Sequence, residues 1–146
     1  MKLVVQRVTS ASVEVDDKII GEIEEGLMVL VGFGENDTAK EADYLARKLA
    51  KLRIFEDENG RMNKSVMDIG GKLLLVPQFT LYAHTKKNRP SFHKALAPDK
   101  ATTLFDYFTD KCRELVEVET GEFGAFMKVN LLNNGPVTIL LEKEFE

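Results

Sequence analysis

The stretch LMVLVGFGENDTAKEADYLARKLAKL (residues 27–52) decides the fold class. Its first seven residues form an unbroken apolar run, which is typical of a strand buried on both faces. Thr38 and Glu41 then have the spacing of a capping box at the start of a helix. Apolar residues follow every three or four positions, at Ala42, Leu45, Ala46, Leu49 and Leu52. A buried strand that leads into an amphipathic helix predicts an α/β domain.

Further strand and helix patterns lie on either side of this stretch. Valines alternate with polar residues in 12–16, and the turn at Asp16-Asp17 predicts that residues 18–24 pair back as a hairpin. Pro98 suits the first turn of a second helix, which we expect over residues 98–116. Other strands are expected at residues 3–8, 72–76, 116–118, 127–132 and 137–142. Hairpin and crossover connections occur together, so we expect a mixed sheet with two helices.

Length and composition describe a single domain. The chain has 146 residues, of which 44% are hydrophobic and 30% charged, and no linker-like segment divides it. A chain of this length can hold a full core, so we expect one domain over residues 1–146. The formal net charge of −4 excludes a protein that coats nucleic acid through its overall charge, but it is compatible with a local basic patch.

The cysteine count and the N-terminal segment bear on the compartment. A single cysteine, Cys112, allows no intramolecular disulfide, which favours a reducing environment. The first apolar run is broken by Gln6 and Arg7 and is too short for a signal peptide or a membrane span. We therefore expect a cytoplasmic protein with no membrane partner.

The usual catalytic side chains are not arranged for chemistry. The two histidines, His84 and His93, lie nine residues apart and far from Cys112, so no metal-ligand spacing is present. The motifs of serine hydrolases, phosphate-binding loops and dinucleotide-binding folds are missing. The glycines Gly32 and Gly34 are interpreted as a simple turn. We expect neither a metal nor a cofactor.

Two segments interrupt the apolar pattern of the predicted strands. Residues 77–81 (PQFTL) place polar side chains directly after the buried strand 72–76. Backbone N–H groups freed beside Pro77 could face a ligand there, and a plain strand edge or bulge is the alternative. Residues 133–138 (NNGPVT) contain Asn-Gly-Pro, which predicts a hairpin turn.

Two further segments have compositions that suit binding. Residues 85–94 carry four Lys and Arg side chains around Phe92, with a histidine at or beside each end. This loop suits a phosphate or a nucleotide end, and a solvated loop is the alternative. Residues 121–127 (GEFGAFM) set small residues between aromatic ones, which indicates backbone packed near a ligand or a bulge.

Taken in order, these segments resemble the D-aminoacyl-tRNA deacylase family. The two signature motifs of the family match Gln78-Phe79-Thr80-Leu81 and Asn134-Gly135-Pro136-Val137-Thr138. Residues 5–8 (VQRV), 89–92 (RPSF) and 123–127 (FGAFM) are also similar to the family. The match covers essentially the whole chain, and five motifs in register are highly specific.

The resemblance implies a fold, an activity and a partner. The fold would be a mixed α/β domain with a barrel-like core that is completed in a homodimer. The reaction would be hydrolysis of the ester that joins a D-amino acid, or glycine, to the terminal adenosine of tRNA. The partner would be the CCA end of aminoacyl-tRNA, and the role would be proofreading in translation.

The resemblance also implies roles for particular residues. A cis Gly135-Pro136 bond would face Gln78–Leu81 of the other subunit, and its rigid carbonyl oxygens would reject L-amino acids. Catalysis is assigned to Gln78, Phe79 and Thr80. Arg7, Ala125 and Phe126 are expected to contribute to substrate binding and chiral selection. Lys86, Arg89 and Phe92 are expected to hold the tRNA 3′ end.

Within that site, the sequence favours backbone groups over a side-chain nucleophile. A Thr80 nucleophile would need a base within hydrogen-bond reach, and His84 is a conceivable base in the loop that follows. The N–H groups of Phe79 and Thr80 could instead form an oxyanion site, while the ribose 2′-OH of the substrate orients water.

Pro77 departs from the family pattern, which commonly has serine there. The Pro-Gln start resembles sister deacylases that clear mischarged L-alanine and whose Gly-Pro bond is trans, whereas Phe79 and residues 137–138 resemble the D-specific group. Two other functions stay open on the residues alone. One is a non-catalytic domain that binds RNA ends, and the other is a hydrolase of small D-amino-acid esters or amides.

Overall fold

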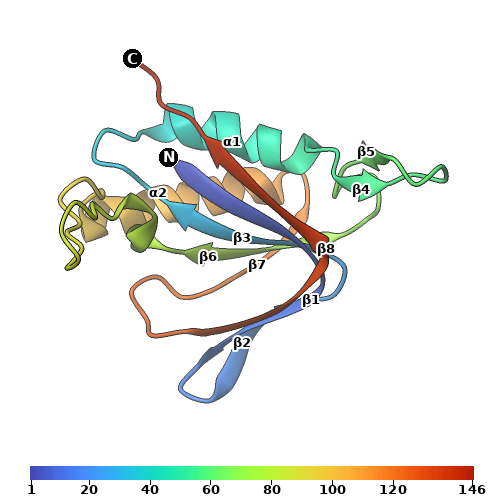
Figure 1. The fold of residues 1–146 in the computed structure, drawn as a ribbon, viewed down its shortest axis with the longest axis horizontal. Helices are drawn as coiled ribbons and strands as arrows, with labels where there is room; N and C mark the ends of the chain where they lie inside the picture. The colour runs from blue at the N-terminus through green and yellow to red at the C-terminus, as the bar shows by residue number, and fades with distance from the viewer.

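A mixed β-sheet and two α-helices make up the fold in the computed structural model, which describes residues 1–146 (Figure 1). The strands are β1 (Lys2–Val15), β2 (Lys18–Ile23), β3 (Gly26–Gly32), β4 (Phe55–Glu56), β5 (Met62–Lys64), β6 (Lys72–Pro77), β7 (Glu117–Thr120) and β8 (Lys128–Glu142). The helices are α1 (Ala39–Lys51), the short 3₁₀ helix η1 (Phe79–Tyr82) and α2 (Pro98–Arg113). The predicted α/β class and mixed sheet with two helices are confirmed.

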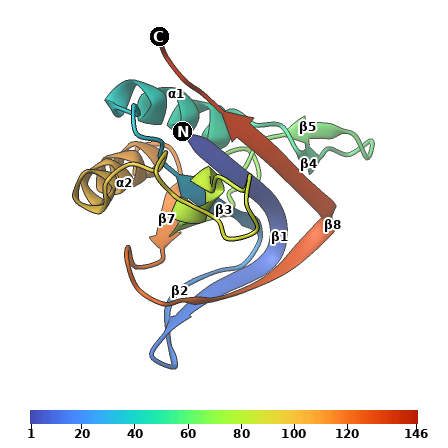
Figure 2. The same ribbon diagram turned by 60° about the vertical axis from the view of Figure 1, so that its left-hand side comes forward.

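The long strand β1 organises the sheet. Along one edge its first half pairs antiparallel with β3 and its second half with β2, while β8 pairs antiparallel along the other edge. Strand β6 lies parallel to β3, and β7 lies parallel to β6. Figure 2 shows β1 and β8 bending together around the interior, so the sheet is nearly closed and barrel-like.

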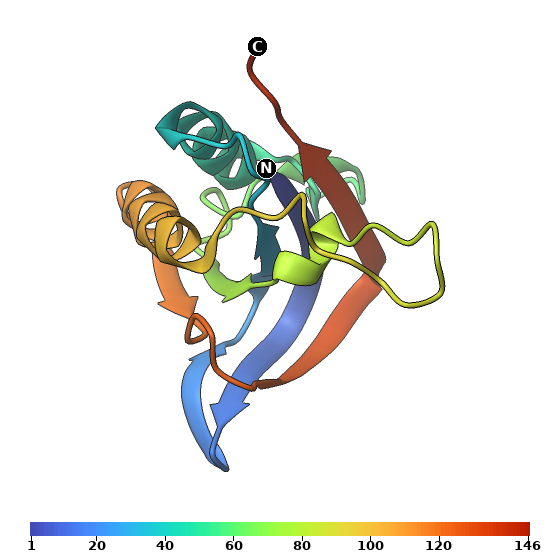
Figure 3. The same ribbon diagram turned by 90° about the vertical axis from the view of Figure 1, so that its left-hand side faces the viewer.

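Two hydrophobic cores follow from this curvature. The larger core lies between the sheet and the helices and includes Leu3, Leu45 and Phe108, all at most 1% exposed. Figure 3 shows α1 and α2 on the same side of the sheet. The smaller core fills the curled sheet, where Val13, Met28 and Leu74 are buried. Glycine at position 21 lets β2 approach β7, because a Cβ there would lie 2.8 Å from the Thr120 oxygen.

Helix α1 begins as its sequence predicts. The Thr38 backbone N–H donates to Glu41 Oε1 at 2.8 Å, and the Thr38 hydroxyl oxygen accepts from the Lys40 N–H at 3.3 Å. The predicted capping box is confirmed. Helix α2 starts at Pro98 as expected and ends at Arg113, three residues before the predicted end.

Two predicted strand breaks are wrong. Residues 3–8 and 12–15 belong to one strand, β1, and the hairpin predicted at Asn133–Pro136 lies within β8. The register against β1 shifts at this place, and the Gly135-Pro136 bond is cis. The Asn133 side chain bridges the irregularity, since Oδ1 accepts from the Val137 N–H at 2.7 Å and Nδ2 donates to the Val137 oxygen. Side-chain hydrogen bonds thus replace ladder bonds and allow the strand to continue.

None of the helices has both the length and the apolar composition needed to cross a membrane.

Candidate active site

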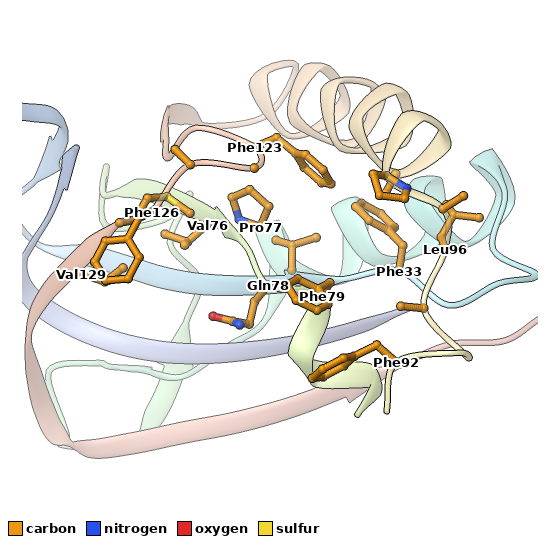
Figure 4. Close-up of a pocket in the computed structure, with 18 residues that line it drawn as sticks. Phe33, Val76, Pro77, Gln78, Phe79, Phe92, Leu96, Phe123, Phe126 and Val129 are labelled. Atoms are coloured by element: carbon orange, nitrogen blue, oxygen red, sulfur yellow. The ribbon is translucent and has the colours of Figure 1, made fainter. Parts of the chain in front are cut away.

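A pocket of about 560 Å³ opens at the carboxyl end of β6 (Figure 4). Three segments wall it: the junction of β6 with η1, residues 92–98, and residues 123–129. Val31 and Phe33 at the end of β3 close its base. The pocket therefore joins two of the segments that the sequence singles out, 77–81 and 121–127, with the end of the basic loop.

Aromatic rings dominate the rim of the pocket. The rings of Phe79 and Phe92 meet edge to face, with centroids 4.9 Å apart. Phe79 is 56% exposed and Phe126 is 88% exposed, so both rings are open to a ligand. Exposed aromatic faces are suited to stacking against planar groups such as nucleobases.

No titratable side chain lines the pocket. Its walls carry apolar side chains, backbone, and the amide of Gln78 as the only polar side chain. General acid–base catalysis by a His, Asp or Glu within hydrogen-bond reach is therefore not provided by the walls of this pocket. The chemistry available there comes from backbone N–H groups, the Gln78 amide and the ligand itself.

The turn into η1 presents two of those backbone donors. The Gln78 N–H donates to the Val31 oxygen at 2.8 Å, which anchors the turn to β3. The N–H groups of Phe79 and Thr80 come next, at the start of a 3₁₀ helix that offers them no acceptor. The Gln78 Nε2 donates to Thr80 Oγ1, so the hydroxyl oxygen of Thr80 is already an acceptor.

Close backbone packing holds this turn in place. A Cβ on Gly32 would lie 2.9 Å from Leu81 Cβ and 3.1 Å from the Gln78 oxygen, so only glycine lets η1 pack against β3. Tyr82 at the end of η1 packs against Gly34, with its hydroxyl buried and without a partner. Burial, with Asp37 nearby, raises the pKa of Tyr82 well above its usual value, so this phenol stays neutral.

The basic loop follows η1 and turns back through a short bridge. The His84 N–H donates to the Ser91 oxygen at 2.8 Å, and the Ser91 N–H donates to the His84 oxygen at 3.0 Å. Lys86 and Arg89 lie at the exposed tip, whereas Phe92 turns into the pocket. The ring of His84 lies against His93, with centroids 5.2 Å apart, and does not line the pocket.

A second group of predicted residues lies elsewhere, at the irregular part of β8. Gly135 and Pro136 are exposed, and neither lines the pocket. Arg7 is 6% exposed; its Nε donates to the Asn134 oxygen at 2.8 Å and its Nη1 to the Ile54 oxygen at 2.7 Å. Arg7 Nη2 lies 3.2 Å from the position that a Cβ on Gly135 would occupy. The buried guanidinium thus packs against the Gly135-Pro136 segment and holds it through the Asn134 oxygen.

The predicted site residues therefore fall into three places in one chain. Five of them line the pocket: Gln78, Phe79, Phe92, Ala125 and Phe126. Thr80 adjoins it, Lys86 and Arg89 lie in the loop, and Arg7, Gly135 and Pro136 lie on β1 and β8. Sequence reasoning missed Phe33 and residues 95–98. The Phe33 oxygen accepts from the Leu96 N–H and ties residues 95–98 to β3, a contact between distant parts of the chain that no local pattern indicates.

The chain matches a known protein family over almost its whole length. A family model described as D-Tyr-tRNA(Tyr) deacylase matches residues 4–142. The D-aminoacyl-tRNA deacylase of Thermosipho melanesiensis is 53% identical over 147 residues, covering 99% of this chain and 98% of the relative. The D-aminoacyl-tRNA deacylase of Bacillus pumilus is 56% identical over 146 residues, covering 99% of each.

Solved structures share the fold. The structure of c-Myc DNA Unwinding Element Binding Protein superposes with a TM-score of 0.95 at 44% identity, covering 99% of this chain and 100% of that one. A structure described as a probable eukaryotic D-amino acid tRNA deacylase superposes with a TM-score of 0.85 at 19% identity, covering 96% and 97%. The barrel-like mixed sheet with two helices is thus the arrangement seen in these structures.

Proposed function

The chain belongs to the D-Tyr-tRNA(Tyr) deacylase family and is a hydrolase of the ester bond in D-aminoacyl-tRNA, and from this premise we propose that backbone groups carry the reaction. The observation that carries the proposal is the absence of any titratable side chain from the walls of the pocket. Without a side-chain base, activation and charge stabilisation must come from backbone dipoles and from the substrate.

The proposed chemical step is direct attack by water. Water adds to the ester carbonyl carbon, and the carbonyl oxygen becomes an oxyanion that accepts from the N–H groups of Phe79 and Thr80. Collapse of the tetrahedral intermediate breaks the bond to the ribose 3′-oxygen, which takes the proton lost by the attacking water and leaves as the tRNA hydroxyl. The neighbouring ribose 2′-OH orients the water. The products are a free D-amino acid and tRNA.

Thr80 acts in this scheme through its backbone and not as a nucleophile. Its hydroxyl oxygen accepts from Gln78 Nε2, and no imidazole or carboxylate contacts it. A hydroxyl without a base stays protonated near neutral pH and is a weak nucleophile. The Gln78–Thr80 contact is better suited to fixing the turn that aims the two N–H groups.

Chiral selection is proposed to come from a second copy of the chain. Gly135 and Pro136 are exposed and lie away from the pocket of their own chain, so they can reach a pocket only in a partner subunit. Their carbonyl oxygens would accept from the α-ammonium group and occupy the space that an L side chain needs. Arg7 would hold that segment through the Asn134 oxygen.

If L side chains are rejected in this way, we expect a second class of substrate. Glycine has no side chain to reject, so glycyl-tRNA mischarged on other tRNAs would also be hydrolysed. Selectivity built from backbone does not depend on the identity of the D side chain, which matches the open, apolar pocket.

The tRNA 3′ end is proposed to lie between the basic loop and the rim of the pocket. Lys86 and Arg89 at the exposed tip would contact phosphates, and Phe92 would stack on a base. Since aminoacyl-tRNA is the substrate, we propose that the protein acts in the cytoplasm. The composite site proposed above would make it a homodimer.

The test is a panel of charged tRNAs at one enzyme concentration: D-Tyr-tRNA, L-Tyr-tRNA, Gly-tRNA and L-Ala-tRNA. We expect rapid release from D-Tyr-tRNA and Gly-tRNA while L-Tyr-tRNA stays intact. Preferential release of L-alanine would overturn the chiral proposal and move the enzyme to the sister class that Pro77 resembles. Hydrolysis of all four would exclude rejection by Gly135 and Pro136.

A further inference from the structure

A row of cations covers the solvent side of α1 and the residues that follow it. We call this surface the α1 basic face; it consists of Lys40, Arg47, Lys48, Lys51 and Arg53. All five residues are exposed, and none of them makes an ion pair. A hollow lined by Tyr44, Arg47, Lys48, Lys51, Leu52 and Arg53 lies along it. Five unpaired cations on one side are notable in a chain whose net charge is −4.

The two acidic residues of α1 do not neutralise this face. Glu41 is 3% exposed and accepts from the N–H groups of Thr38 and Phe145. Asp43 accepts from the Tyr107 hydroxyl at 2.6 Å, on the side of the helix that faces α2. Both carboxylates are thus engaged by the fold, so among the charged side chains of α1 only the cations are free on the solvent side. Asp57 and Asp68 lie near Arg53, beyond the end of the helix.

Arg53 is held in position for a ligand. Its Nε donates to the Asn63 backbone oxygen at 2.9 Å, and its Nη2 donates to the Asn63 side-chain oxygen. Asn63 is itself fixed by donating to Asp57 Oδ2 at 3.2 Å. These bonds leave Nη1 of an ordered guanidinium open to solvent, and an ordered guanidinium loses less entropy when it binds phosphate.

The α1 basic face begins near the pocket and extends away from it (Figure 1). Helix α1 starts beside the pocket wall, because the preceding Glu35 N–H donates to the Lys94 oxygen, and it runs away toward β4 and β5 (Figure 1). Its 13 residues span about 20 Å, so Lys51 and Arg53 lie about that far from the start of the helix. In tRNA the reacting ester ends a single-stranded tail, which separates it from the first base pairs.

We propose that the α1 basic face binds backbone phosphates of the base-paired acceptor arm of the substrate tRNA. The inference rests on the proposed function, since it takes the reacting CCA end to lie in the pocket. The enzyme then holds its substrate at two places, with the ester in an uncharged pocket and the duplex on the cations of α1. The helix dipole alone explains cations in the last turn of α1, but it does not extend to Arg53 beyond the helix.

The experiment measures binding of uncharged tRNA by fluorescence anisotropy at several salt concentrations. The variant Arg47→Gln/Lys51→Gln removes two cations from the face. The control Lys18→Gln/Lys72→Gln removes two cations elsewhere, in the β1–β2 hairpin and at the start of β6, where Lys72 pairs with Glu117. We expect the slope of log K against log salt to become shallower by about two units in the first variant only, since each lost phosphate contact removes about one unit. Equal slopes in the two variants would overturn the proposal.

A second measurement separates this surface from the chemistry of the pocket. Hydrolysis of D-aminoacyl-tRNA is compared with that of a D-aminoacyl CCA trinucleotide, which lacks the duplex. The α1 variant should lose kcat/KM on the tRNA, through KM, and keep it on the trinucleotide; equal losses on both would contradict the proposal. If neither substrate is hydrolysed by the unmodified chain, the proposed function fails, while the anisotropy result still decides whether this face binds RNA.

Discussion

At the residue scale, Phe79 isolates the contribution of one backbone donor. Proline removes the N–H, and its φ of about −65° suits the first position of a 3₁₀ helix. We expect Phe79→Pro to be about 100–1,000-fold slower in kcat than Phe79→Ala, because one oxyanion donor is lost. Both variants lack the ring, so the comparison cancels its effect. Equal rates in single-turnover hydrolysis of D-Tyr-tRNA would exclude this N–H from the oxyanion site.

Thr80 separates the hydroxyl from the backbone in the same turn. We expect Thr80→Ala to keep kcat within about tenfold of the unmodified enzyme, since the backbone N–H remains and only the contact with Gln78 is lost. Removal of a true nucleophile costs about 10⁶-fold. Thr80→Ser, which keeps the hydroxyl, serves as the control. A rate near background in the alanine variant with full activity in the serine variant would restore the nucleophile.

Replacement of Arg7 is expected to lower the stability of the fold as well as to affect function. Arg7→Met keeps much of the side-chain volume but leaves the buried Ile54 oxygen and the partly buried Asn134 oxygen without their donor. We expect the free energy of unfolding to fall by about 2–4 kcal/mol, measured by urea denaturation. Gln6→Met, on the half-buried neighbouring position, is the control and should change it by less than about 1 kcal/mol. A loss in Arg7→Met no larger than in the control would mean that these bonds contribute little.

At the scale of elements, the start of α1 predicts a pH dependence. Burial opposes the charged form of Glu41, but hydrogen bonds from the backbone of Thr38 and Phe145 outweigh it and lower its pKa below the ordinary 4.5. A lowered pKa contributes stability above the unfolded-state pKa, and this contribution is lost as the pH falls through the folded-state pKa. The difference in stability between the unmodified chain and Glu41→Gln should therefore shrink between pH 5 and pH 3. A constant difference across urea melts in that range would contradict the prediction.

Helices and strands were predicted correctly where their pattern involves residues close together in the sequence, and less well where contacts between distant residues decide the structure. The capping box of Thr38 and Glu41 and the period of α1 are local patterns, and both were confirmed. The break predicted at Asn133–Pro136 was wrong, because Asn-Gly-Pro is a turn signal only when nothing holds the strand together. Here the Asn133 side chain and the pairing with β1 hold it, and those contacts join residues far apart in the sequence. The short strands β4 and β5, of two and three residues, were not predicted, because segments of that length are too short to show a strand pattern.

At the scale of the whole molecule, the cross-subunit proposal predicts complementation between two defective variants. Gly135→Ala places a Cβ 2.6 Å from Val137 Cγ2 and distorts the selecting segment. Phe79→Pro impairs the pocket. In a mixed dimer with one copy of each, one of the two sites would combine intact parts from both chains. Co-refolding at equal amounts should therefore restore about a quarter of the normal chirally selective activity, measured as D-Tyr-tRNA release with L-Tyr-tRNA intact.

Two outcomes would contradict that arrangement. Activity of the mixture equal to the mean of the two variants alone would place both segments in one chain. Full, selective activity in a monomer, verified by light scattering at the assay concentration, would do the same. Mixing each variant with the unmodified chain provides the control for refolding losses.

The site could be predicted from sequence only in part. Residues 77–81 stand out because they break the apolar pattern, and residues 121–127 because they set small residues between aromatic ones; both segments reach the pocket. Phe33 does not stand out, since a phenylalanine at the end of a buried strand is the expected residue there. Its place in the pocket depends on the Leu96 N–H that bonds to its oxygen, 63 residues along the chain. The roles proposed for Gly135 and Pro136 would require a second chain, which no pattern in one sequence supplies.

The walls of the pocket, which lack titratable side chains, have a consequence for chemical inhibition. Electrophilic inhibitors disable many hydrolases by reacting with an activated serine, cysteine or histidine. Here the only thiol, that of Cys112, is buried in α2, and burial raises its pKa to about 12, so it stays protonated and unreactive. Reagents of that class should find no target in the pocket. An inhibitor would have to be a non-hydrolysable mimic of the aminoacylated ribose, held by the same backbone groups that hold the substrate.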